Sequence, residues 1–370
     1  MIDLKYIRTH TQEVRNAILN KNEKANLDAI LALDENRRKL QYEYDQLRSK
    51  QHQVSQIIVL KKRNGEDVSE LLAEMSEVAE QIRALNAQLT ETNTQLENLL
   101  LTIPNIPHPD VPIGKDESAN RVIKLWGEKP NFTFTPLDHL ELAEKNRLLD
   151  IPRGAKISGS GFPVYTGIGA IWERALINFM LNFHIQKHNY TELAVPVLVT
   201  RKTMTGTGQL PKLEDDMYRI EADDLFLIPT AEVPVTNFFA DEILPQDRLP
   251  IKFVSYTPCF RREAGSYGKE TKGLQRLHQF NKVELVRFVE PSTSYQALEE
   301  IREDAEEILQ ALNLHYRVVE LCTADLSFAS AKTYDIEVWA PGLGKYLEVS
   351  SISNFEDFQA RRANIRYRDT

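Results

Sequence analysis

Charged and aromatic side chains alternate at regular spacing between Phe260 and Glu284, in a pattern that suits the binding of a nucleotide. The segment opens with Arg261 and Arg262, crosses a stretch rich in Gly and Lys, and returns as an alternating run that contains Phe280. This pattern predicts two strands joined by a long flexible loop. A guanidinium can hold phosphate oxygens in bidentate fashion, and an aromatic ring can stack on a base. From spacing alone, a solvated surface hairpin with charged strand ends explains the pattern equally well.

The same segment, FRREAGSYGKETKGLQRLHQFNKVE, resembles motif 2 of the class II aminoacyl-tRNA synthetases in the form found in seryl-tRNA synthetases. The match is long and ungapped. The resemblance implies that Arg261 is a catalytic residue that contacts the α-phosphate of ATP, and that Phe280 stacks on adenine. It also assigns Arg262, Glu263 and the backbone near Leu277 to the ATP site.

The resemblance also assigns a role to three consecutive residues upstream of this segment. Thr230, Ala231 and Glu232 match the family's serine-binding triplet, and Glu284 matches its second acidic contact with serine. Two acids and a hydroxyl can bind an ammonium and a hydroxymethyl group, and which acid meets which group stays open. Without the resemblance, Thr230 is interpreted as a helix cap and Glu232 as an acid that complements the helix dipole.

The C-terminal part of the chain matches the family at a four-residue segment of the ATP site. This segment comprises Glu348, Val349, Ser350 and Ser351, and it follows a turn at Pro341–Lys345 between two predicted strands. The resemblance implies that Glu348 and Ser351 hold Mg²⁺ against the phosphates of ATP as hard oxygen ligands. From the residues alone, the segment is an ordinary hairpin.

The reaction implied by the resemblance is the ATP-dependent ligation of L-serine to its tRNA, tRNA(Ser). The serine carboxylate attacks the α-phosphorus in line, so that seryl-adenylate and pyrophosphate form. The seryl group then passes to the 3′-terminal ribose of the tRNA. Positioning and charge neutralisation account for the catalysis. Because the attacking carboxylate is already ionised, no general base is needed, and His278 is interpreted as structural.

The first element of the expected architecture is a long helical hairpin over about residues 27–100. Apolar residues recur at alternating steps of three and four, which is a heptad seam. Asn64, Gly65 and Asp67 predict a turn between two helices. The pattern predicts an antiparallel coiled-coil hairpin roughly 50 Å long, at about 1.5 Å per residue. The seam residues are Leu33, Leu40, Leu47 and Val54 in the first helix, and Val68, Leu71, Met75, Val78, Ile82, Leu85, Leu89, Leu96 and Leu99 in the second.

The two predicted helices differ strongly in charge. Residues 33–63 hold eight Lys/Arg against four Asp/Glu, a net of +4, whereas residues 66–100 hold one Arg against eight acids, a net of −7. Ion pairs between the two helices would explain this charge difference without RNA. The hairpin would then be a dimerisation or spacer element. In seryl-tRNA synthetases this hairpin grips the long variable arm of the tRNA, so the resemblance implies an RNA-binding face. Its candidate residues are Arg37, Arg38, Lys39, Arg48 and Lys50.

The fold class expected for the whole chain is α+β. The coiled-coil hairpin precedes an antiparallel β-sheet catalytic domain of the class II type, flanked by helices. Four prolines between Ile103 and Asn120 mark a boundary. We therefore expect a tRNA-binding domain over residues 1–103, a Pro-rich linker over 104–120 and a catalytic domain over 121–370.

A homodimer is implied by a second resemblance. Residues Gly167 to Val199 predict a helix followed by a strand that Pro196 interrupts. This pair resembles motif 1, which builds the dimer interface of class II synthetases. The segment that follows from Thr203, TMTGTGQLPKL, is predicted to be a mobile polar loop.

The composition is that of a globular protein. The net charge is −9, so any contact with RNA depends on local basic patches. No apolar run is long enough to span a membrane, and the start of the chain, MIDLKYIRTH, has no signal-peptide character. Cys259 and Cys322 are predicted to be unrelated thiols. Together these features predict a cytoplasmic protein without a membrane partner.

The resemblance extends from the first residue to Arg368 and stops before motif 3, a Gly-rich segment whose Arg clamps ATP in the family. We therefore expect residues 1–370 by themselves to have weak activity or none. Two other functions compete with a serine–tRNA ligase. An amino acid:carrier-protein ligase on the same core is disfavoured by the long hairpin. A non-catalytic dimeric coiled-coil protein derived from the enzyme is disfavoured by the intact site motifs.

Overall fold

The computed structural model describes residues 1–263 and 274–368. The Gly- and Lys-rich loop predicted between the two strands falls on residues 264–273 and lies outside the described residues. Among the described helices, none is both long and apolar enough to cross a membrane. Cys259 and Cys322 are free and buried, as predicted.

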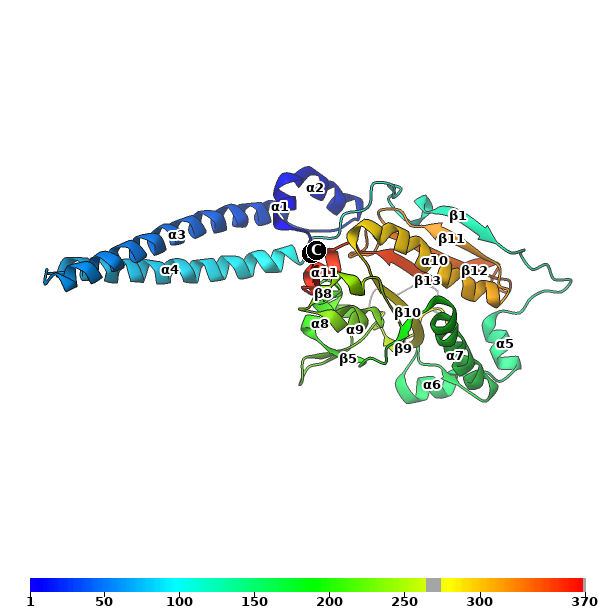
Figure 1. Ribbon diagram of the computed structural model, residues 1–370. Coiled ribbons are helices and arrows are strands. Elements are labelled where there is room, and N and C mark those ends of the chain that lie inside the picture. Colours follow the sequence, from blue (N-terminus) through cyan, green and yellow to red (C-terminus); the bar gives the residue numbers. More distant parts are fainter. Residues whose placement is uncertain (264–273, 369–370) are drawn as a thin grey trace. The chain divides into compact units, whose positions relative to one another are not determined.

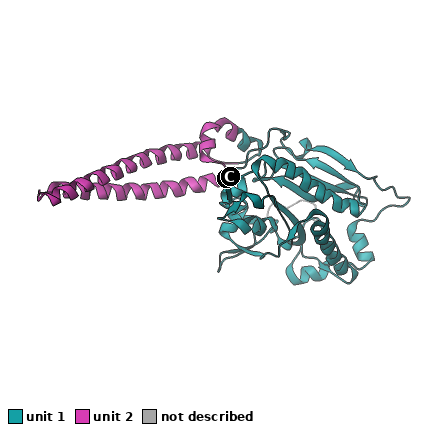
Figure 2. Cartoon of the chain, viewed as in Figure 1, with its two compact units in different colours: residues 1, 16–23, 104–370 teal, residues 2–15, 24–103 magenta. Residues whose placement is uncertain are grey.

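The chain forms two compact units that do not follow the order of the sequence strictly (Figure 2). The domain limits predicted at residues 103 and 120 stay predictions. Unit 1 comprises residues 1, 16–23 and 104–370, and unit 2 comprises residues 2–15 and 24–103.

Unit 2 contains the predicted hairpin of two long helices, α3 (Leu27–Arg63) and α4 (Ser69–Leu100), which lie side by side (Figure 1). In the turn between them, Gly65 adopts a φ of 74°, which suits a residue without a Cβ. Asp67 then accepts hydrogen bonds from the backbone and the hydroxyl of Ser69 at the start of α4. The coiled-coil hairpin is therefore confirmed. Two short helices precede it in the chain, α1 (Leu4–Thr9) and α2 (Thr11–Asn20).

Unit 1 contains a four-stranded antiparallel sheet that is covered by helix α10 (Ser294–Ala311). Leu298 and Leu309 of this helix join Tyr316 and Ile336 of the sheet in one buried cluster. The predicted hairpin around residues 341–345 is confirmed. In the order in which they lie side by side, the strands are β1 (Arg121–Trp126), β11 (Tyr316–Glu320), β12 (Lys332–Ala340) and β13 (Lys345–Asn354).

The segment with the nucleotide-binding pattern forms a second sheet. β9 (Ile251–Phe260) and β10 (Gln279–Phe288) pair in antiparallel fashion along their whole length, and the short β4 (Thr191–Glu192) pairs in parallel with β9. Helix α7 (Ile168–His188) packs on this sheet, where its Leu181 is buried in a shared cluster. The two strands predicted on either side of the loop are therefore confirmed.

Shorter elements complete the described part of unit 1. The additional strands pair β2 (Leu149–Asp150) with β3 (Val164–Tyr165), β7 (Leu225–Leu227) with both β5 (Leu198–Thr200) and β6 (Arg219–Ile220), and β8 (Ile243–Pro245) with β14 (Arg366–Arg368). The additional helices are α5 (His139–Lys145), α6 (Ile151–Ser158), α8 (Arg201–Gly206), α9 (Glu232–Thr236) and α11 (Phe358–Arg362).

Two predicted segments after α7 differ in detail from the structure. The strand interrupted at Pro196 consists of two pieces, β4 and β5, that belong to different sheets, because a proline cannot donate to a sheet ladder. The prediction of a mobile polar loop from Thr203 is wrong. Its first residues lie in α8, and Met204 and Leu210 are buried in a cluster with Phe226. Small polar residues between these apolar side chains hide this packing in the sequence.

Candidate functional site

The pairing of β9 with β10 puts a row of long side chains on one face of the sheet. Phe280, Lys282 and Glu284 alternate along β10 and share a face, because strand side chains have a period of two. The residues directly opposite them on β9 point to the same side of the sheet and have short side chains, which leaves room for the long side chains of β10. These β9 residues are the buried Cys259, Thr257 and Ser255.

Arg261 lies directly after β9 and faces the first residue of this row. The central carbon of its guanidinium is 5.0 Å from the centroid of the Phe280 ring, which is a cation–π pair. Its Nε donates to the carbonyl of Pro229 at 3.4 Å, and its backbone N–H donates to the carbonyl of His278 at 3.0 Å. Because Arg261 is exposed, its terminal N–H groups can meet an anion beside the ring.

The other residues predicted near the ATP site have different partners. The side chain of Arg262 donates to the carbonyl of Asp215 at 3.2 Å. Glu263 forms an ion pair with Arg276 at 3.2 Å, and Leu277 is buried. Arg262 is therefore held by the segment around Asp215, and Arg261 is the cation that lies beside the ring of Phe280.

Thr230, Glu232, Lys282 and Glu284 converge on one small site, which we call the acid pocket. The Thr230 hydroxyl donates to Glu284 Oε2 at 2.7 Å. The Lys282 ammonium lies 2.7 Å from the same carboxylate oxygen and 3.1 Å from Thr230 Oγ1. The backbone N–H of Glu232, at the start of α9, donates to Thr230 Oγ1 at 3.2 Å, and Ala231 is fully buried. The structure thus brings the two predicted acids and the predicted hydroxyl together.

Glu232 has an electrostatic environment that favours a cationic partner. Its Oε1 accepts a hydrogen bond from Gln359 Nε2 of α11 at 2.5 Å. Burial and the neighbouring carboxylate of Glu284 raise the pKa of Glu232 to about 7, while Lys282, Gln359 and Arg261 act in the opposite direction. A bound cation would lower this pKa again, because it stabilises the ionised form. The acid pocket is therefore suited to an ammonium group.

A bulge in β13 brings the predicted Mg²⁺ ligands to one face of the four-stranded sheet. Glu348 is paired with Glu337 of β12, and Ser351 is paired with Asp335. The register shifts between these two pairs, so that Val349 is the extra residue, and it is 54% exposed. Because Asp335 and Glu337 are two residues apart, their partners Glu348 and Ser351 share a face. In a regular strand, residues three apart point to opposite faces.

Asp335 adds an unsatisfied oxygen to this face. Within the described part of the chain, its buried Oδ1 has no hydrogen-bond partner. Burial and the charge of Glu348 raise the pKa of Asp335 to about 7, against a hydrogen bond from Ser351. Carboxylates that repel each other beside a hydroxyl match the donor set that Mg²⁺ prefers, and a divalent cation would offset their repulsion. The residues present therefore fit a bound Mg²⁺.

Lys282, Gln359 and Asp335 belong to the site but are not among the residues that the sequence predicts there. A signal for Lys282 was available, because it stands between Phe280 and Glu284 in the alternating pattern and must share their face. Gln359 and Asp335 have no comparable local signal. They come from α11 and β12 and reach the site only through tertiary packing.

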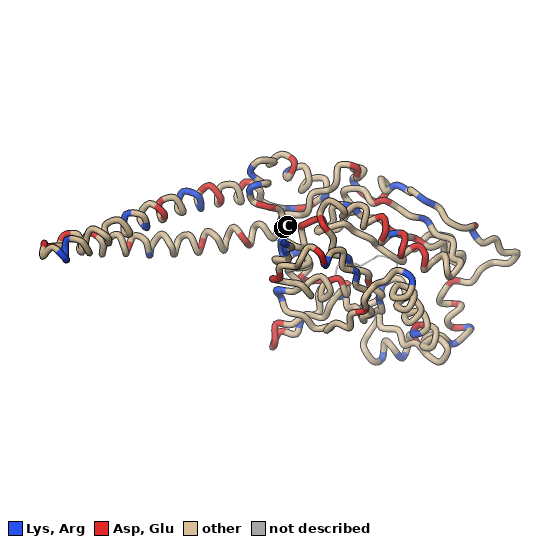
Figure 3. The backbone as a smooth tube through the Cα atoms, in the orientation of Figure 1, with Lys and Arg blue, Asp and Glu red and all other residues tan. Residues whose placement is uncertain are grey.

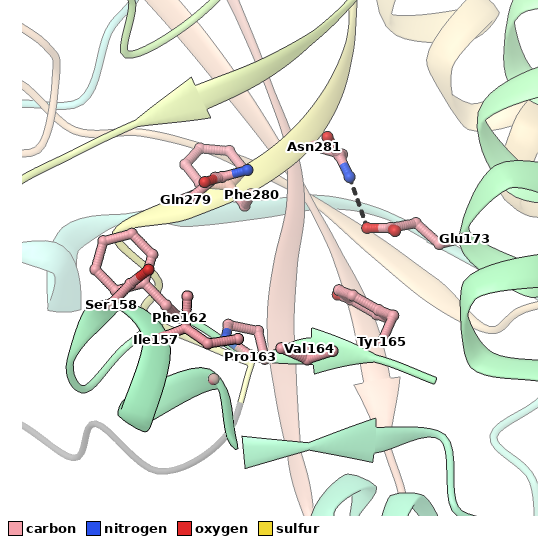
Figure 4. Close-up of a pocket in the computed structure, with 11 residues that line it drawn as sticks. Ile157, Ser158, Phe162, Pro163, Val164, Tyr165, Glu173, Gln279, Phe280 and Asn281 are labelled. Atoms are coloured by element: carbon pink, nitrogen blue, oxygen red, sulfur yellow. Dashed lines mark hydrogen bonds between the residues drawn. The ribbon is translucent and has the colours of Figure 1, made fainter. Parts of the chain in front are cut away.

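A further pocket of about 210 Å³ lies where α6 and β3 meet β10 (Figure 4). Phe162 and Tyr165 contribute aromatic rings to it, and Asn281 of β10 donates a hydrogen bond to Glu173 of α7 at 2.6 Å. Phe280 also lines this pocket, so that it borders both the pocket and the guanidinium of Arg261. Asn281 therefore connects the site-bearing strand to α7.

In unit 2, four of the five basic side chains predicted to contact RNA have acidic partners, and both charges are visible along α3 (Figure 3). Asp34, whose side chain is 1% exposed, lies 2.8, 3.0 and 3.2 Å from guanidinium nitrogens of Arg8, Arg37 and Arg38, respectively. Three cations around one anion leave a local charge of +2. The buried carboxylate thus fixes three guanidinium groups near the base of α3.

The remaining predicted basic residues lie further along α3. Lys39 pairs with Glu35 at 2.7 Å, and Lys50 pairs with Glu74 of α4 at 2.5 Å. Arg48 donates to the side chain of Gln51 at 3.2 Å. The Lys50–Glu74 contact is a cross-helix pair of the kind that the charge pattern predicts.

Two family models match the chain. The model for the seryl-tRNA synthetase N-terminal domain matches residues 1–107. The model for the tRNA synthetase class II core domain (G, H, P, S and T) matches residues 213–370.

Curated relatives and solved structures match the whole chain. The serine–tRNA ligases of Caldicellulosiruptor saccharolyticus and Geobacter sulfurreducens are 54% and 51% identical to it over 370 and 369 residues, which is 100% of this chain and 87% of each relative. The crystal structure of seryl-tRNA synthetase from Pyrococcus horikoshii complexed with ATP has a TM-score of 0.94 at 39% identity, covering 100% of this chain and 88% of that one. For the cytoplasmic serine–tRNA ligase of Naegleria fowleri in complex with AMP, the TM-score is 0.86 at 25% identity, covering 99% and 88%.

Proposed function

The chain belongs to the seryl-tRNA synthetase family, and from this premise we propose that its acid pocket binds L-serine beside ATP. It is a serine–tRNA ligase, an aminoacyl-tRNA ligase that uses ATP and tRNA. A carrier-protein ligase and a non-catalytic coiled-coil protein are not favoured, because the relatives that match the chain over its whole length, hairpin included, are serine–tRNA ligases.

The single observation that supports a serine site is the convergence of Thr230, Glu232 and Glu284. We infer that the ammonium group of serine binds Glu232, because Glu284 already has the cationic partner Lys282. The serine hydroxyl then meets Glu284 and Thr230, and Ala231 contributes only its backbone. A ligand without a hydroxyl leaves these polar atoms unpaired, which penalises its binding.

The ATP site is proposed at the other end of the same row. Adenine stacks on Phe280, and the guanidinium of Arg261 contacts the α-phosphate. Glu263 and the backbone of Leu277 line the adenine end, and Arg262, which donates a hydrogen bond to the carbonyl of Asp215, borders the same site. The serine carboxylate attacks the α-phosphorus, the bond to the bridging oxygen breaks, and pyrophosphate leaves. Arg261 offsets the charge that this step concentrates on the α-phosphate.

The proposed ligands of Mg²⁺ are Glu348 and Ser351, with Asp335 as a third oxygen donor on the same face. Val349 is the extra residue of the bulge that puts Glu348 and Ser351 on one face, and Ser350 is paired with Ile336 of β12. When bound, Mg²⁺ offsets negative charge on the phosphates of ATP.

The pH dependence of serine binding tests the proposed role of Glu232. Because residues 1–370 by themselves are expected to have weak activity or none, this assay and the other activity assays use the chain with the family's C-terminal continuation restored. Its ionised fraction falls as the pH drops below about 7, and only the ionised form attracts an ammonium. We expect the KM for serine in ATP–pyrophosphate exchange to be roughly thirtyfold higher at pH 5.5 than at pH 8. The E232Q variant should have a high KM at both pH values. A KM that does not change with pH in the unmodified enzyme contradicts the assignment.

We further propose that the arm formed by α3 and α4 binds tRNA(Ser). The cluster of Arg8, Arg37 and Arg38 around Asp34 supports this, because it presents excess positive charge near the base of the arm. Further basic residues lie along the same helix in the direction of its turn with α4, namely Lys39, Arg48 and Lys50. A tRNA substrate also supports a cytoplasmic location.

A homodimer is proposed through α7. Ile168, Ile171, Trp172 and Leu176 are each between 44% and 55% exposed, and their spacing puts them on one face of the helix. Apolar patches of this kind mark interaction sites, and a two-fold axis lets the same patch meet itself. Because Glu173 of this helix accepts a hydrogen bond from Asn281, the patch is connected to the catalytic strand β10.

Replacing Trp172 with glutamate is expected to weaken the dimer at least about thirtyfold, because a charge would have to be buried at the centre of the patch. Sedimentation velocity at micromolar concentration should show a dimer for the unmodified protein and a monomer for W172E. The matched control is L60E, which changes an equally exposed apolar residue on α3 and should leave the dimer intact. A dimer that persists in W172E would exclude this face.

A further inference from the structure

We propose that Lys282 binds the carboxylate of serine and keeps contact with it as the bond to the α-phosphorus forms. This inference rests on the proposed serine site. Lys282 stands between Phe280 and Glu284 in one row on β10, which spans the proposed positions of adenine and of the serine hydroxyl. Successive members of the row are about 7 Å apart. The group between them therefore faces the point where nucleotide and amino acid are joined.

The hydrogen bonds of Lys282 leave it with capacity for a ligand. An ammonium has three N–H donors, and within the described part of the chain, Glu284 and Thr230 account for two of them. The side chain is 35% exposed, compared with 14% for Glu284, so it is the more accessible of the two to a ligand. Glu284 raises the pKa of Lys282 above its ordinary value, although partial burial works against the charged form. Lys282 is therefore a cation whose position is set by its contacts with Glu284 and Thr230.

The arrangement of charges matches an amino acid zwitterion. Glu232 has no cation in hydrogen-bond contact among the described residues, and it is the acid available to the ammonium of serine. The charges of Lys282 and Arg261 both act on Glu232; Lys282 lies in β10, and Arg261 directly follows the neighbouring strand β9. A carboxylate between these cations would be neutralised in the ground state. Its charge passes partly to the α-phosphate when the carboxylate oxygen attacks and pyrophosphate leaves.

A pair of ligands separates this role from a merely structural one. L-Serine has a carboxylate, whereas L-serinamide keeps the ammonium and hydroxyl but replaces the carboxylate with an uncharged amide. In ATP–pyrophosphate exchange, we expect K282M to raise the KM for serine about twentyfold, which is the effect of losing one charge-assisted hydrogen bond. The inhibition constant of serinamide should change less than about threefold. K282R should recover part of the affinity for serine that K282M loses, and it should leave the inhibition constant of serinamide unchanged.

Two further variants make the outcomes distinguishable. K202M removes an exposed lysine that pairs with Asp241 on the surface, and it should leave both constants unchanged. E232Q should weaken serine and serinamide alike, because both ligands have the ammonium. If K282M weakens both ligands equally, Lys282 only holds Glu284 in place and the proposal is overturned, while the serine pocket stands. If E232Q affects neither ligand, the pocket assignment itself fails and the role of Lys282 fails with it.

Discussion

Replacing Arg261 with alanine is expected to lower the rate of serine-dependent ATP–pyrophosphate exchange by about a thousandfold. The central carbon of the guanidinium lies 5.0 Å from the centroid of the Phe280 ring, and Arg261 is an exposed residue that can contact the α-phosphate. Removing one preorganised donor from the position where charge develops costs about 10²–10³ in rate, and the lost cation adds to this. The fall should occur in kcat, because the interaction strengthens as the transition state forms.

The matched control for this variant is R83A, which removes an exposed arginine from the arm helix α4. Its exchange rate should stay within about twofold of that of the unmodified enzyme, because surface substitutions remote from the site have small effects. Thermal unfolding of both variants checks that the fold is kept. A loss of less than about tenfold in R261A would show that another group neutralises the α-phosphate.

Shortening the arm is expected to impair the transfer of serine to tRNA while sparing the activation of serine by ATP. Lys50 is paired with Glu74, so residues 43 and 81, one heptad further from the turn on each helix, also lie opposite each other. A variant that lacks residues 44–80 and joins the two helices by a short Gly-rich turn keeps the apolar seam of the remaining hairpin. We expect its rate of tRNA(Ser) charging to fall by at least about a hundredfold, because the distal basic residues can no longer meet the phosphate backbone.

Pyrophosphate exchange by the shortened enzyme should stay within about twofold of normal, since the proposed serine and ATP sites belong to unit 1. The salt dependence of charging provides a second check. Contacts between lysine or arginine and phosphate release counterions, so the full-length arm should give the steeper loss of tRNA affinity with rising salt. If the shortened enzyme charges tRNA normally, the arm is a spacer.

Strongly periodic features could be predicted from the sequence. The heptad seam specified the α3–α4 hairpin, and the alternation up to Glu284 specified the β9–β10 pair, because each pattern repeats over many residues. The assignment to the seryl-tRNA synthetase family and the α+β class II fold are confirmed. They depended on the resemblance of long, ungapped motifs, such as the segment from Phe260 to Glu284, because the spacing of Arg261 and Arg262 alone fits a surface hairpin equally well.

Features that depend on one residue or on distant segments could not be predicted. The bulge at Val349 moves Glu348 and Ser351 to one face, yet an extra residue in a strand leaves the local pattern nearly unchanged. Gln359 is brought to Glu232 by packing of α11, far along the chain. The buried Met204 was masked by the small polar residues around it. In each case tertiary contacts override what a short window of sequence indicates.

The most direct test of the account is a crystal structure of the enzyme with L-serine and ATP bound. We expect the adenine ring on Phe280, the α-phosphate at the guanidinium of Arg261, and the serine ammonium within about 3 Å of Glu232. Density for either molecule elsewhere, or serine with its ammonium remote from both Glu232 and Glu284, would contradict the central claim that one face of β10 joins the two substrates.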